Sequence, residues 1–396
     1  MQNNRIWSRD FTLALVINFA LASVFYLLMT TMALYAVERF GAGDSLAGLA
    51  AGAYVLGAVV ARLLASKYLD FVGRKRMIVI CLSAFVVLSL LYLVTTSLAG
   101  LIVLRLVHGM AFGAASTAVA SSAISLVPTA KRGEGTGYFS ISATLAVGVG
   151  PLIGTLLIEG VGFEGLFWAS TIASILGLAA ALALRPPERE LSEEEVATKW
   201  RIRPSDLLEA RAMPIATIVF LACFAYSGAL AFYLNYADAT GSTSEAAAFF
   251  TTYSIAVFVV RLVAGRVQDR FGDNAVFYPT LGIFAVGLVV LSLPPSLPLA
   301  IAGGALVAVG FGTIMPGGQA AAVSSTSPAR VAVATSTFFI SADSAIGVGP
   351  IVLGALLHFT GYDGMYLVLA GLVVVTIGVY ALTHGRARAG AATRMS

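Results

Sequence analysis

Long hydrophobic segments separated by short polar ones run through almost the whole chain. A helix needs about 20 apolar residues to cross the hydrocarbon core of a bilayer, and glycine, proline and charge clusters mark the gaps between the segments. We therefore predict an all-α integral membrane protein with twelve transmembrane helices, near residues 11–36, 45–69, 77–96, 101–127, 134–158, 163–184, 214–236, 245–267, 275–293, 298–323, 331–357 and 362–383.

The charges between these segments predict the orientation of the helices. With the amino terminus inside, every Lys and Arg residue of the loops and tails except Arg39 falls on the cytoplasmic side. Cytoplasmic loops of membrane proteins carry such an excess of positive charge. We expect a multi-pass protein of a bacterial cytoplasmic (inner) membrane, with both termini in the cytoplasm.

Composition excludes a soluble protein. The 396 residues are 59% hydrophobic and 11% charged, whereas soluble domains are about 45–50% apolar and about 25% charged. Cys81 and Cys223 stand alone in apolar runs, so neither a disulfide framework nor a metal site is expected. The net charge of +4 is scattered over short loops, which disfavours nucleic acid as a partner. The expected partners are the lipid bilayer and a small-molecule substrate, and the expected functional form is a monomer.

One polar stretch, residues 185–212, is long enough to divide the chain. It contains Pro186-Pro187 and the acidic run Glu193-Glu194-Glu195. We interpret it as a solvated cytoplasmic linker between an N-terminal six-helix bundle (1–184) and a C-terminal six-helix bundle with a short tail (213–396). Ser192 followed three residues later by Glu195 matches a capping box, which predicts a short surface helix there.

The two halves repeat each other in sequence. A shift of 199 residues without gaps aligns 62–73 with 261–272, 148–151 with 347–350, and 162–165 with 361–364. Six helices in each copy give the copies the same topology. Parallel six-helix halves that rock about a site near the membrane midplane are one established transporter architecture.

The residues also resemble the major facilitator superfamily over essentially the whole chain. The family signature between helices 2 and 3, Gly-x-x-x-Asp-x-x-Gly-Arg-Lys-x, is similar to Ser66, Asp70, Gly73, Arg74, Lys75 and Arg76, with Ser66 in place of glycine. The helix 4 signature, Arg-x-x-Gln-Gly, resembles Arg105, His108 and Gly109. The helix 5 signature of the drug/proton antiporter branch resembles Gly137, Ala146, Gly150, Pro151, Gly154 and Thr155, with two glycines replaced.

The resemblance implies a cytoplasmic gate at the two copies of the loop signature. An anion at the inner end of a helix can pair with arginine or cap the start of another helix, and a glycine permits the tight turn that follows. A plain topogenic loop is the alternative, because it needs only the positive charges. We assign the gate to Arg62, Asp70, Gly73, Arg74, Arg261, Asp269 and Gly272.

Glycine and proline predict a hinge deep in helices 5 and 11. Small residues allow close helix approach, and proline frees a backbone carbonyl. Ordinary glycine packing is the alternative to a kinked, sliding contact between the halves. The hinge candidates are Gly150, Pro151, Gly154, Gly349 and Pro350.

Charged side chains inside the bilayer are candidates for coupling transport to protons. Each costs about 2.5–3.5 kcal/mol at a helix centre, so it usually has a function or a partner. Asp343 lies mid-helix, and burial favours the neutral form of a carboxyl group, so Asp343 could take up and release a proton. His108 titrates near neutrality, and Arg105 lies on the same helix face. The alternatives are a structural hydrogen bond for Asp343, polar packing for His108 and snorkelling to the outer interface for Arg105.

In this superfamily helices 1, 4, 7 and 10 line the central cavity, and the resemblance directs attention to their polar and aromatic stripes. Packing is the alternative for each of these side chains, because membrane helices are apolar on all sides. Besides His108, the candidates are Asn18, Phe25, Tyr26, Phe112, Phe224, Ser227, Asn235, Phe311, Met315 and Gln319. A mostly apolar cavity suits a lipophilic, neutral or cationic small molecule better than a sugar.

The sequence therefore favours a secondary active transporter that exports a small lipophilic or drug-like molecule or metabolite by proton-coupled alternating access. A proton symporter or uniporter that imports a small nutrient is the alternative. No metalloprotease, serine-hydrolase or P-loop motif occurs, so we expect no enzyme activity, and no cofactor or metal beyond the coupling proton.

Overall fold

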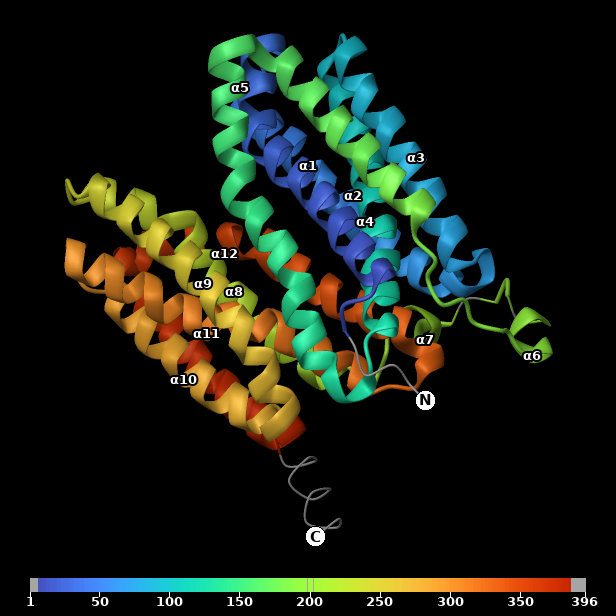
Figure 1. Ribbon diagram of the computed structural model, residues 1–396. Coiled ribbons are helices and arrows are strands. Elements are labelled where there is room, and N and C mark those ends of the chain that lie inside the picture. Colours follow the sequence, from blue (N-terminus) through green and yellow to red (C-terminus); the bar gives the residue numbers. More distant parts are fainter. Residues whose placement is uncertain (1–5, 198, 202, 386–396) are drawn as a thin grey trace. The chain divides into compact units, whose positions relative to one another are not determined.

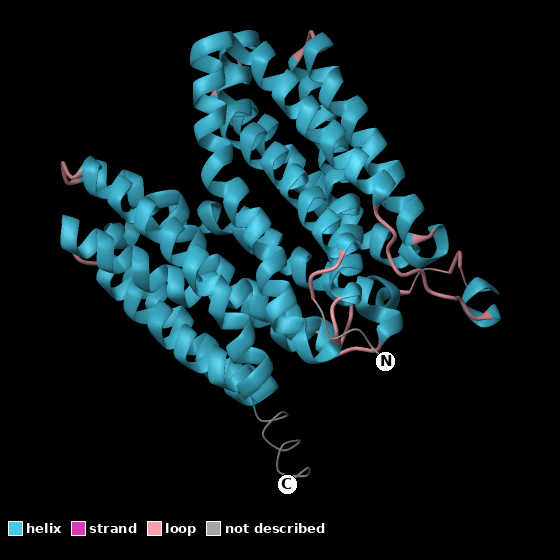
Figure 2. Cartoon of the chain, in the orientation of Figure 1, coloured by secondary structure: helices cyan, strands magenta, loops and turns pink. Residues whose placement is uncertain are grey.

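The structure, a computed structural model, describes residues 6–197, 199–201 and 203–385. Within these ranges every regular element is helical and no strand is present, as Figure 2 shows. This confirms the predicted all-α fold. Ten of the described helices are long and apolar enough to cross a membrane.

The first five long helices follow one another closely (Figure 1). Their bounds are α1 Arg9–Phe40, α2 Asp44–Val72, α3 Arg74–Leu91, α4 Leu98–Leu126 and α5 Arg132–Ala183, with 3₁₀ turns at Tyr92–Val94 and Thr129–Lys131. Two short helices then lie in the linker, α6 Glu193–Ala197 and α7 Pro204–Leu207. The second series comprises α8 Met213–Ala239, α9 Thr243–Phe271, α10 Asp273–Leu291, α11 Leu297–Ser324 and α12 Val331–Tyr380, followed by a π-helical turn at Ala381–Gly385.

Two of these helices are each interrupted by one glycine. Gly162 breaks α5 with φ 74° and ψ −174°, and Gly361 breaks α12 with φ 67° and ψ 179°. Positive φ favours glycine, which has no Cβ to clash with the backbone. The breaks divide the described chain into the twelve long helical stretches that the sequence predicts.

The backbone repeats with the sequence. Gly162 and Gly361 are 199 residues apart and share one conformation. Gly73 and Gly272, separated by the same shift, also share positive φ values of 90° and 82° at the α2–α3 and α9–α10 turns. The internal repeat is thus confirmed at the positions where the chain must turn.

The chain folds into two compact units whose boundaries differ slightly from the sequence bundles. The first unit comprises residues up to Pro128, Phe139–Glu209 and Ser327–Ser336, and the second comprises Thr129–Tyr138, Ala210–Thr326 and the residues from Thr337 onward. Each unit therefore contains the start of a long helix, α5 or α12, whose remainder belongs to the other.

Glycine brings α2 and α4 together in the first unit. A Cβ built on Gly109 of α4 would lie 1.9 Å from the carbonyl oxygen of Tyr54 in α2, and one on Gly113 would lie 2.3 Å from that of Ala58. Close packing of this kind is what holds membrane helices together when lipid is as apolar as the side chains.

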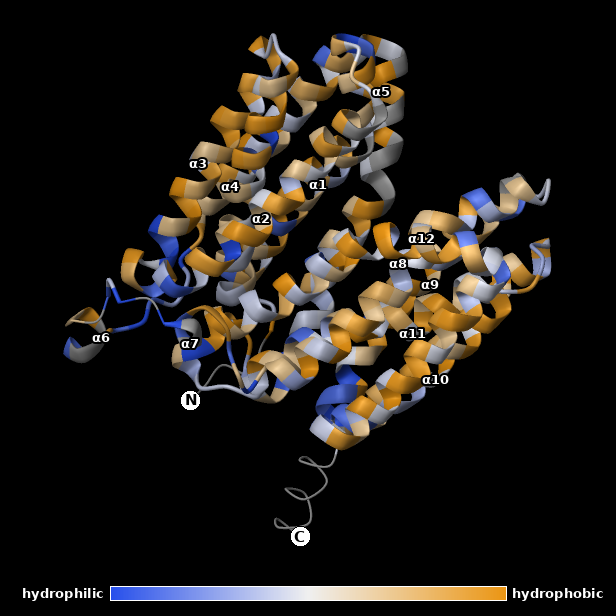
Figure 3. Ribbon diagram, turned by 180° about the vertical axis from the view of Figure 1, so that it is seen from behind, coloured by the Kyte–Doolittle hydropathy of each residue, from blue (hydrophilic) through white to orange (hydrophobic). Residues whose placement is uncertain are grey.

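Large apolar side chains cover much of the outer surface of both units. Leu176 is 60% exposed, Ile351 75% and Phe359 88%. Figure 3 shows the long helices as mostly hydrophobic, with hydrophilic residues gathered on the linker near α6 and α7. An apolar surface of this extent needs an apolar surrounding, and the bilayer supplies it.

Candidate functional site

The second copy of the loop signature caps a neighbouring helix. Asp269 lies at the inner end of α9, where "inner" denotes the helix ends predicted to face the cytoplasm. Its Oδ1 accepts a hydrogen bond from the backbone N–H of Gly133 at 2.7 Å, and its Oδ2 accepts one from Glu134 at 2.7 Å. These N–H groups begin α5 and have no intrahelical partner, so the carboxylate satisfies two of them and complements the helix dipole.

An ion pair and a close backbone contact reinforce this cap. Arg266 Nε donates to Glu134 Oε1 at 2.8 Å, and the Arg266 guanidinium also donates to the hydroxyl of Tyr138. A Cβ on Gly265 would lie 2.3 Å from the carbonyl oxygen of Gly133. The first turns of α5 therefore fit against α9 with no room for a larger residue at position 265.

The first copy of the signature is satisfied differently. Asp70 accepts a hydrogen bond from Arg74 Nε at 3.1 Å and faces Arg189 of the linker at 3.6 Å. Arg74 also donates through Nη1 to Ser125 of α4 at 2.8 Å. Asp70 thus pairs with arginine, whereas Asp269 caps a helix, and the two copies of one motif hold different partners.

The linker supplies the anion that caps α3. The Glu188 carboxylate accepts hydrogen bonds from the backbone N–H groups of Arg74 at 2.8 Å and Lys75 at 2.9 Å. These N–H groups lie in the first turn of α3, directly after the turn residue Gly73, and have no acceptor within the helix. Part of the linker is therefore hydrogen-bonded to the α2–α3 turn, although Glu188 stays exposed to solvent. The short helix predicted after Ser192 is present as α6.

A second linker contact lies one helical turn before Asp70. Lys67 Nζ forms an ion pair with Asp206 Oδ2 at 3.0 Å and also donates to the carbonyl oxygen of Arg201. Burial raises the pKa of Asp206, but the N–H of Arg203 and the Lys67 ammonium outweigh it, and the net pKa is lowered. The Asp206 carboxylate is therefore ionised at neutral pH.

Arg62 and Arg261 each bind a neighbouring helix of their own unit, and their assignment to the gate stays a prediction. Arg62 is 3% exposed and donates through Nη1 to Ser116 Oγ at 3.0 Å and Thr117 Oγ1 at 3.1 Å of α4. Arg261 Nε donates to the carbonyl oxygen of Gly312 in α11 at 3.2 Å. Each arginine lies eight residues before its aspartate, about 12 Å along the helix, and so joins two helices near mid-membrane.

The hinge candidates pack inside single units. A Cβ on Gly150 would lie 2.9 Å from Tyr26 Cβ of α1, one on Gly154 3.2 Å from Thr31 Cγ2, and one on Gly349 2.0 Å from Ser227 Oγ of α8. The only non-helical residue of α5 is Gly162 and that of α12 is Gly361. Within their own units these glycines seat α5 on α1 and α12 on α8, and the sliding contact between the halves stays a prediction. No break in the helix occurs at Gly150-Pro151 or at Gly349-Pro350.

Arg105 and His108 lie in a closed polar cluster of the first unit. Both are 0% exposed. Arg105 donates to the carbonyl oxygens of Ala50 and Ala51 at 3.1 Å each and lies over the Tyr54 ring. His108 Nδ1 is 3.1 Å from the Tyr92 hydroxyl, and Nε2 is 3.4 Å from Ser89 Oγ. This geometry favours polar packing for His108, and Arg105 does not reach an outer interface.

Asp343 lies near the centre of the first stretch of α12, in the second unit. Its side chain is partly exposed and lies within electrostatic range of the Cys223 thiol of α8. Cys223 Sγ is in turn 3.6 Å from Met315 Sδ of α11. Among the twelve long helical stretches of the described residues, no other carboxylate lies so far from a helix end or a glycine break.

The cavity candidates of the first unit gather around one aromatic cluster. Phe25 stacks on Phe112 with ring centroids 5.3 Å apart, and it contacts Tyr26 at 4.8 Å and Tyr54 at 5.5 Å. Asn18 is separate from this cluster. It donates to Ser142 Oγ at 2.8 Å and ties α1 to α5.

The candidates of the second unit are more scattered. Phe311 stacks on Tyr226 at 3.9 Å, with Tyr253 on the other side of Tyr226 at 5.5 Å. Ser227 donates to the carbonyl oxygen of Phe224 in its own helix at 2.7 Å. Gln319 is 3% exposed, and its Nε2 has no hydrogen-bond partner. Asn235 lies exposed near the end of α8, away from Phe311.

Sequence reasoning missed several residues of these clusters. The shift of 199 pairs Tyr54 with Tyr253. Tyr54 contacts Phe112, and Tyr253 stacks on Tyr226, which is the stacking partner of Phe311. The repeat itself therefore indicates these two tyrosines. Nothing in the sequence pattern pointed to Glu188 and Arg189. The described residues contain no group of three or more His, Cys, Asp or Glu side chains that could hold a metal ion.

Comparison with known proteins matches the whole chain. The family model of the Major Facilitator Superfamily matches residues 14–237 and 215–394. An uncharacterized MFS-type transporter of Methanocaldococcus jannaschii is 24% identical over 388 residues, which cover 94% of this chain and 95% of that protein. A Na⁺, Li⁺, K⁺/H⁺ antiporter of Planococcus maritimus is 30% identical over 209 residues, 49% of this chain and 46% of that protein.

Solved structures share the fold. The human organic anion transporter TETRAN has a TM-score of 0.78 at 16% identity, covering 94% of this chain and 98% of that one. The E. coli fucose:proton symporter FucP has a TM-score of 0.73 at 14% identity, covering 94% and 98%. At these identities the likeness concerns the architecture.

Proposed function

The chain belongs to the Major Facilitator Superfamily and is a multi-pass membrane transporter, and on this premise we propose that it exports a small lipophilic molecule in exchange for protons. The single observation that carries the proposal is Asp343, a partly exposed carboxyl group in the middle of a membrane-spanning helix. Such a group is costly to keep unless it has a function.

Asp343 has the surroundings that a proton carrier needs. The neighbouring Cys223 and its contact Met315 bear no charge, and an apolar surrounding favours the neutral carboxyl while water favours the carboxylate. Alternating access changes which surrounding the side chain meets. A proton taken up from the outside is then released to the inside as the substrate moves the other way.

The aromatic clusters support the proposed substrate class. Phe25 stacks on Phe112 in one unit, with the Tyr54 ring tilted against them, and Tyr226 stacks on Phe311 in the other. The arginines beside them are already bonded, as Arg62 is to Ser116. Aromatic surfaces of this kind bind flat apolar molecules and, through cation–π attraction, lipophilic cations.

Exchange of a metal cation for protons is a second candidate. It is favoured by the printed name of the Planococcus maritimus relative, a Na⁺, Li⁺, K⁺/H⁺ antiporter that matches about half of this chain. In that case Asp343 would contact the cation and the proton in turn. The lipophilic substrate is preferred, because the Cys223 thiol lies within electrostatic range of Asp343, and a soft sulfur ligand does not select alkali cations.

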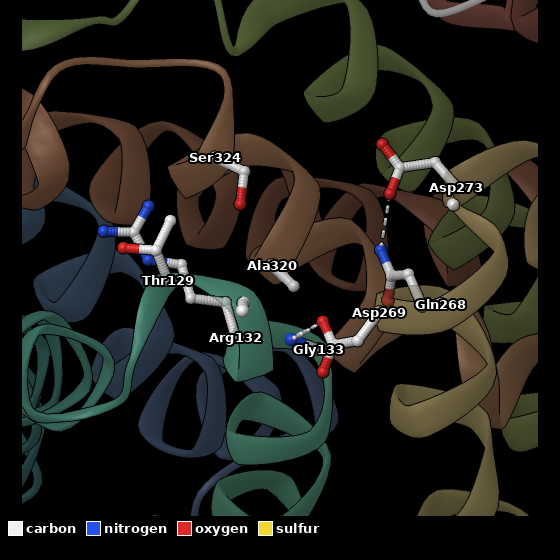
Figure 4. Close-up of a pocket in the computed structure, with 10 residues that line it drawn as sticks. Thr129, Arg132, Gly133, Gln268, Asp269, Asp273, Ala320 and Ser324 are labelled. Atoms are coloured by element: carbon white, nitrogen blue, oxygen red, sulfur yellow. Dashed lines mark hydrogen bonds between the residues drawn. The ribbon is translucent and has the colours of Figure 1, made fainter. Parts of the chain in front are cut away.

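The basic loops support a location in a bacterial inner membrane, with both termini in the cytoplasm. In this orientation the Asp269 cap on α5 (Figure 4) lies at the cytoplasmic side, and the transporter works as a monomer.

Substrate-induced proton movement tests the proposal. The full chain is reconstituted in proteoliposomes that enclose a pH-sensitive dye, and ethidium, NaCl or fucose is added outside. Export by antiport predicts that ethidium alkalinises the lumen, because protons leave as ethidium enters. A response to NaCl alone would favour the cation exchanger, and lumenal acidification on adding fucose would favour a nutrient symporter.

A further inference from the structure

The linker exposes a tryptophan among positive charges. Trp200 is 80% exposed. Lys199, Arg201 and Arg203 flank it, and no acidic residue lies between positions 199 and 203. Lys199 Nζ is 5.1 Å from the centre of the Trp200 ring, and the side chains of Arg201 and Arg203 are exposed. These four residues form a basic patch, which a surface with both apolar and anionic groups complements.

Contacts with the inner end of α2 fix the position of the basic patch. Lys67 of α2 donates to the backbone carbonyl oxygen of Arg201 and forms an ion pair with Asp206 at 3.0 Å. The ring centroids of Tyr68 and Trp200 are 6.3 Å apart, and the short helix α7 packs on α2. Because Lys67 holds Arg201 through its backbone, this contact does not use the exposed guanidinium.

The exposed side chains of α2 indicate the level of the patch in the membrane. Val60 and Leu64 are exposed in this membrane-spanning helix, and steps of four residues put them on one helix face with Tyr68. An uncovered apolar face of this kind suits lipid tails. It ends at the Tyr68–Trp200 pair, and tyrosine and tryptophan gather where the hydrocarbon meets the lipid headgroups.

The acidic residues of the linker leave the positive charge of the patch in place. Asp206 is paired with Lys67. The run Glu193-Glu194-Glu195 belongs to α6, which projects away from the long helices in Figure 1, whereas α7 lies beside them. The inner end of α2 therefore carries the excess positive charge of the patch.

We propose that the basic patch binds anionic phospholipids. Lys199, Arg201 and Arg203 contact the phosphate groups, and the Trp200 ring enters the headgroup region beside Tyr68. Each basic residue near an anionic lipid surface contributes about 1 kcal/mol, which is about a fivefold gain in affinity. The proposal assigns a lipid partner to the linker, so it goes beyond the proposed transport and does not depend on it.

The fluorescence of Trp200 in nanodiscs tests this binding. The full chain carries Trp7→Phe and Trp168→Phe, so that Trp200 is its only tryptophan. Acrylamide, a neutral quencher, reports how far the ring is open to water. We expect acrylamide to quench Trp200 about twofold less in nanodiscs that contain phosphatidylglycerol than in nanodiscs of phosphatidylcholine alone. About 1 M NaCl, which shortens the Debye length to about 3 Å, is expected to remove the difference.

Two matched variants in this background assign the effect to the patch. Arg201→Gln keeps the backbone carbonyl that Lys67 binds and removes one charge, so it is expected to weaken the association of the patch with phosphatidylglycerol about fivefold. Arg270→Gln removes the same charge at an exposed position of α9, in the second unit. It is expected to leave the quenching of Trp200 unchanged in both kinds of nanodisc.

Four results would overturn the proposal: equal quenching in the two kinds of nanodisc, a difference that survives high salt, equal effects of Arg201→Gln and Arg270→Gln, or the same protection from glycerol 3-phosphate added to phosphatidylcholine nanodiscs. The last would assign the patch to a soluble phosphate ester. Nanodiscs present the same lipids on both faces and no transport is measured, so the result is independent of the orientation of the chain and of proton coupling.

Discussion

One methyl group tests how closely α2 and α4 pack. A Cβ at Gly109 would lie 1.9 Å from the carbonyl oxygen of Tyr54, so Gly109→Ala must push the helices apart. We expect a loss of about 1–3 kcal/mol of stability, typical of overpacking, seen as a lower unfolding midpoint in detergent. Gly371→Ala, where nothing lies within 4 Å of the new Cβ, is the control and is expected to be neutral or slightly stabilising. Equal effects would contradict the close approach.

A second single-residue change distinguishes the two gate aspartates. Asn offers one oxygen where Asp269 uses two, so Asp269→Asn frees at least one N–H group at the start of α5. At about 1 kcal/mol per lost cap, the closed cytoplasmic side should open about fivefold more often. Asp70→Asn should have a smaller effect there, because Asp70 pairs with Arg74 and Arg189.

Labelling of a cysteine at Thr136 measures this opening. Thr136 is 1% exposed in α5, and Thr136→Cys in a background without Cys81 and Cys223 reports access for a membrane-impermeant maleimide added from the inner side. We expect faster labelling with Asp269→Asn than with Asp70→Asn. Equal rates for the two variants would show that the difference between the two copies has no effect on gating.

At the scale of elements, the linker is held at the α2–α3 turn by hydrogen bonds. Glu188 caps α3 through the N–H groups of Arg74 and Lys75, so Glu188→Gln should weaken the cap by about 1 kcal/mol and speed tryptic cleavage of the linker about fivefold. Glu190→Gln is the matched control, since Glu190 is exposed two residues away. If both variants are cleaved at the wild-type rate, the linker is not held by Glu188.

The second linker contact predicts how this docking depends on pH. The pKa of Asp206 is lowered, so its pair with Lys67 contributes stability above the ordinary carboxyl pKa of about 3.9 and loses it only as pH falls through the lowered value. Tryptic cleavage in the linker, corrected for the activity of the protease, should therefore be unchanged between pH 8 and pH 6. A marked increase at pH 6 would contradict the assignment.

The helices were predictable from the sequence where a single local property, such as the length of an apolar segment, determines their extent. Span lengths follow from bilayer thickness, and the gaps predicted at 159–162 and 358–361 contain both glycine breaks. Glu188 was not predictable, because it lies 114 residues from its partner, and a Glu-rich linker gives no spacing that selects one carboxylate. The bonds of Arg62 to Ser116 and Thr117 were not predictable either, because the sequence spacing does not show which residues of α4 face it.

At the scale of the whole molecule, the repeat distinguishes residues that support the fold from candidates for function. Residues present in both copies support the fold, and polar residues present in one copy only are the candidates. Arg62 and Arg261, and the glycines of the two turns, occur in both copies and bind helix to helix. Asp343 has no acidic counterpart, since the shift places it on Thr144. The same reasoning gave His108 as a coupling candidate, yet its two ring nitrogens face Tyr92 and Ser89 in a closed cluster. A titratable residue without a counterpart in the other copy is therefore a candidate for proton coupling. The exposure of its side chain then favours Asp343 over the buried His108.

The most direct test of proton coupling is ethidium transport against its gradient by Asp343→Asn in proteoliposomes with an imposed pH gradient. Asn keeps the shape and hydrogen bonding of Asp but cannot titrate, so pH-driven accumulation should be lost while downhill ethidium exchange continues. Asp363→Asn, the same change at an exposed position of α12, should accumulate ethidium like the wild type. Undiminished accumulation by Asp343→Asn would contradict the account, since the coupling proton would then be carried elsewhere.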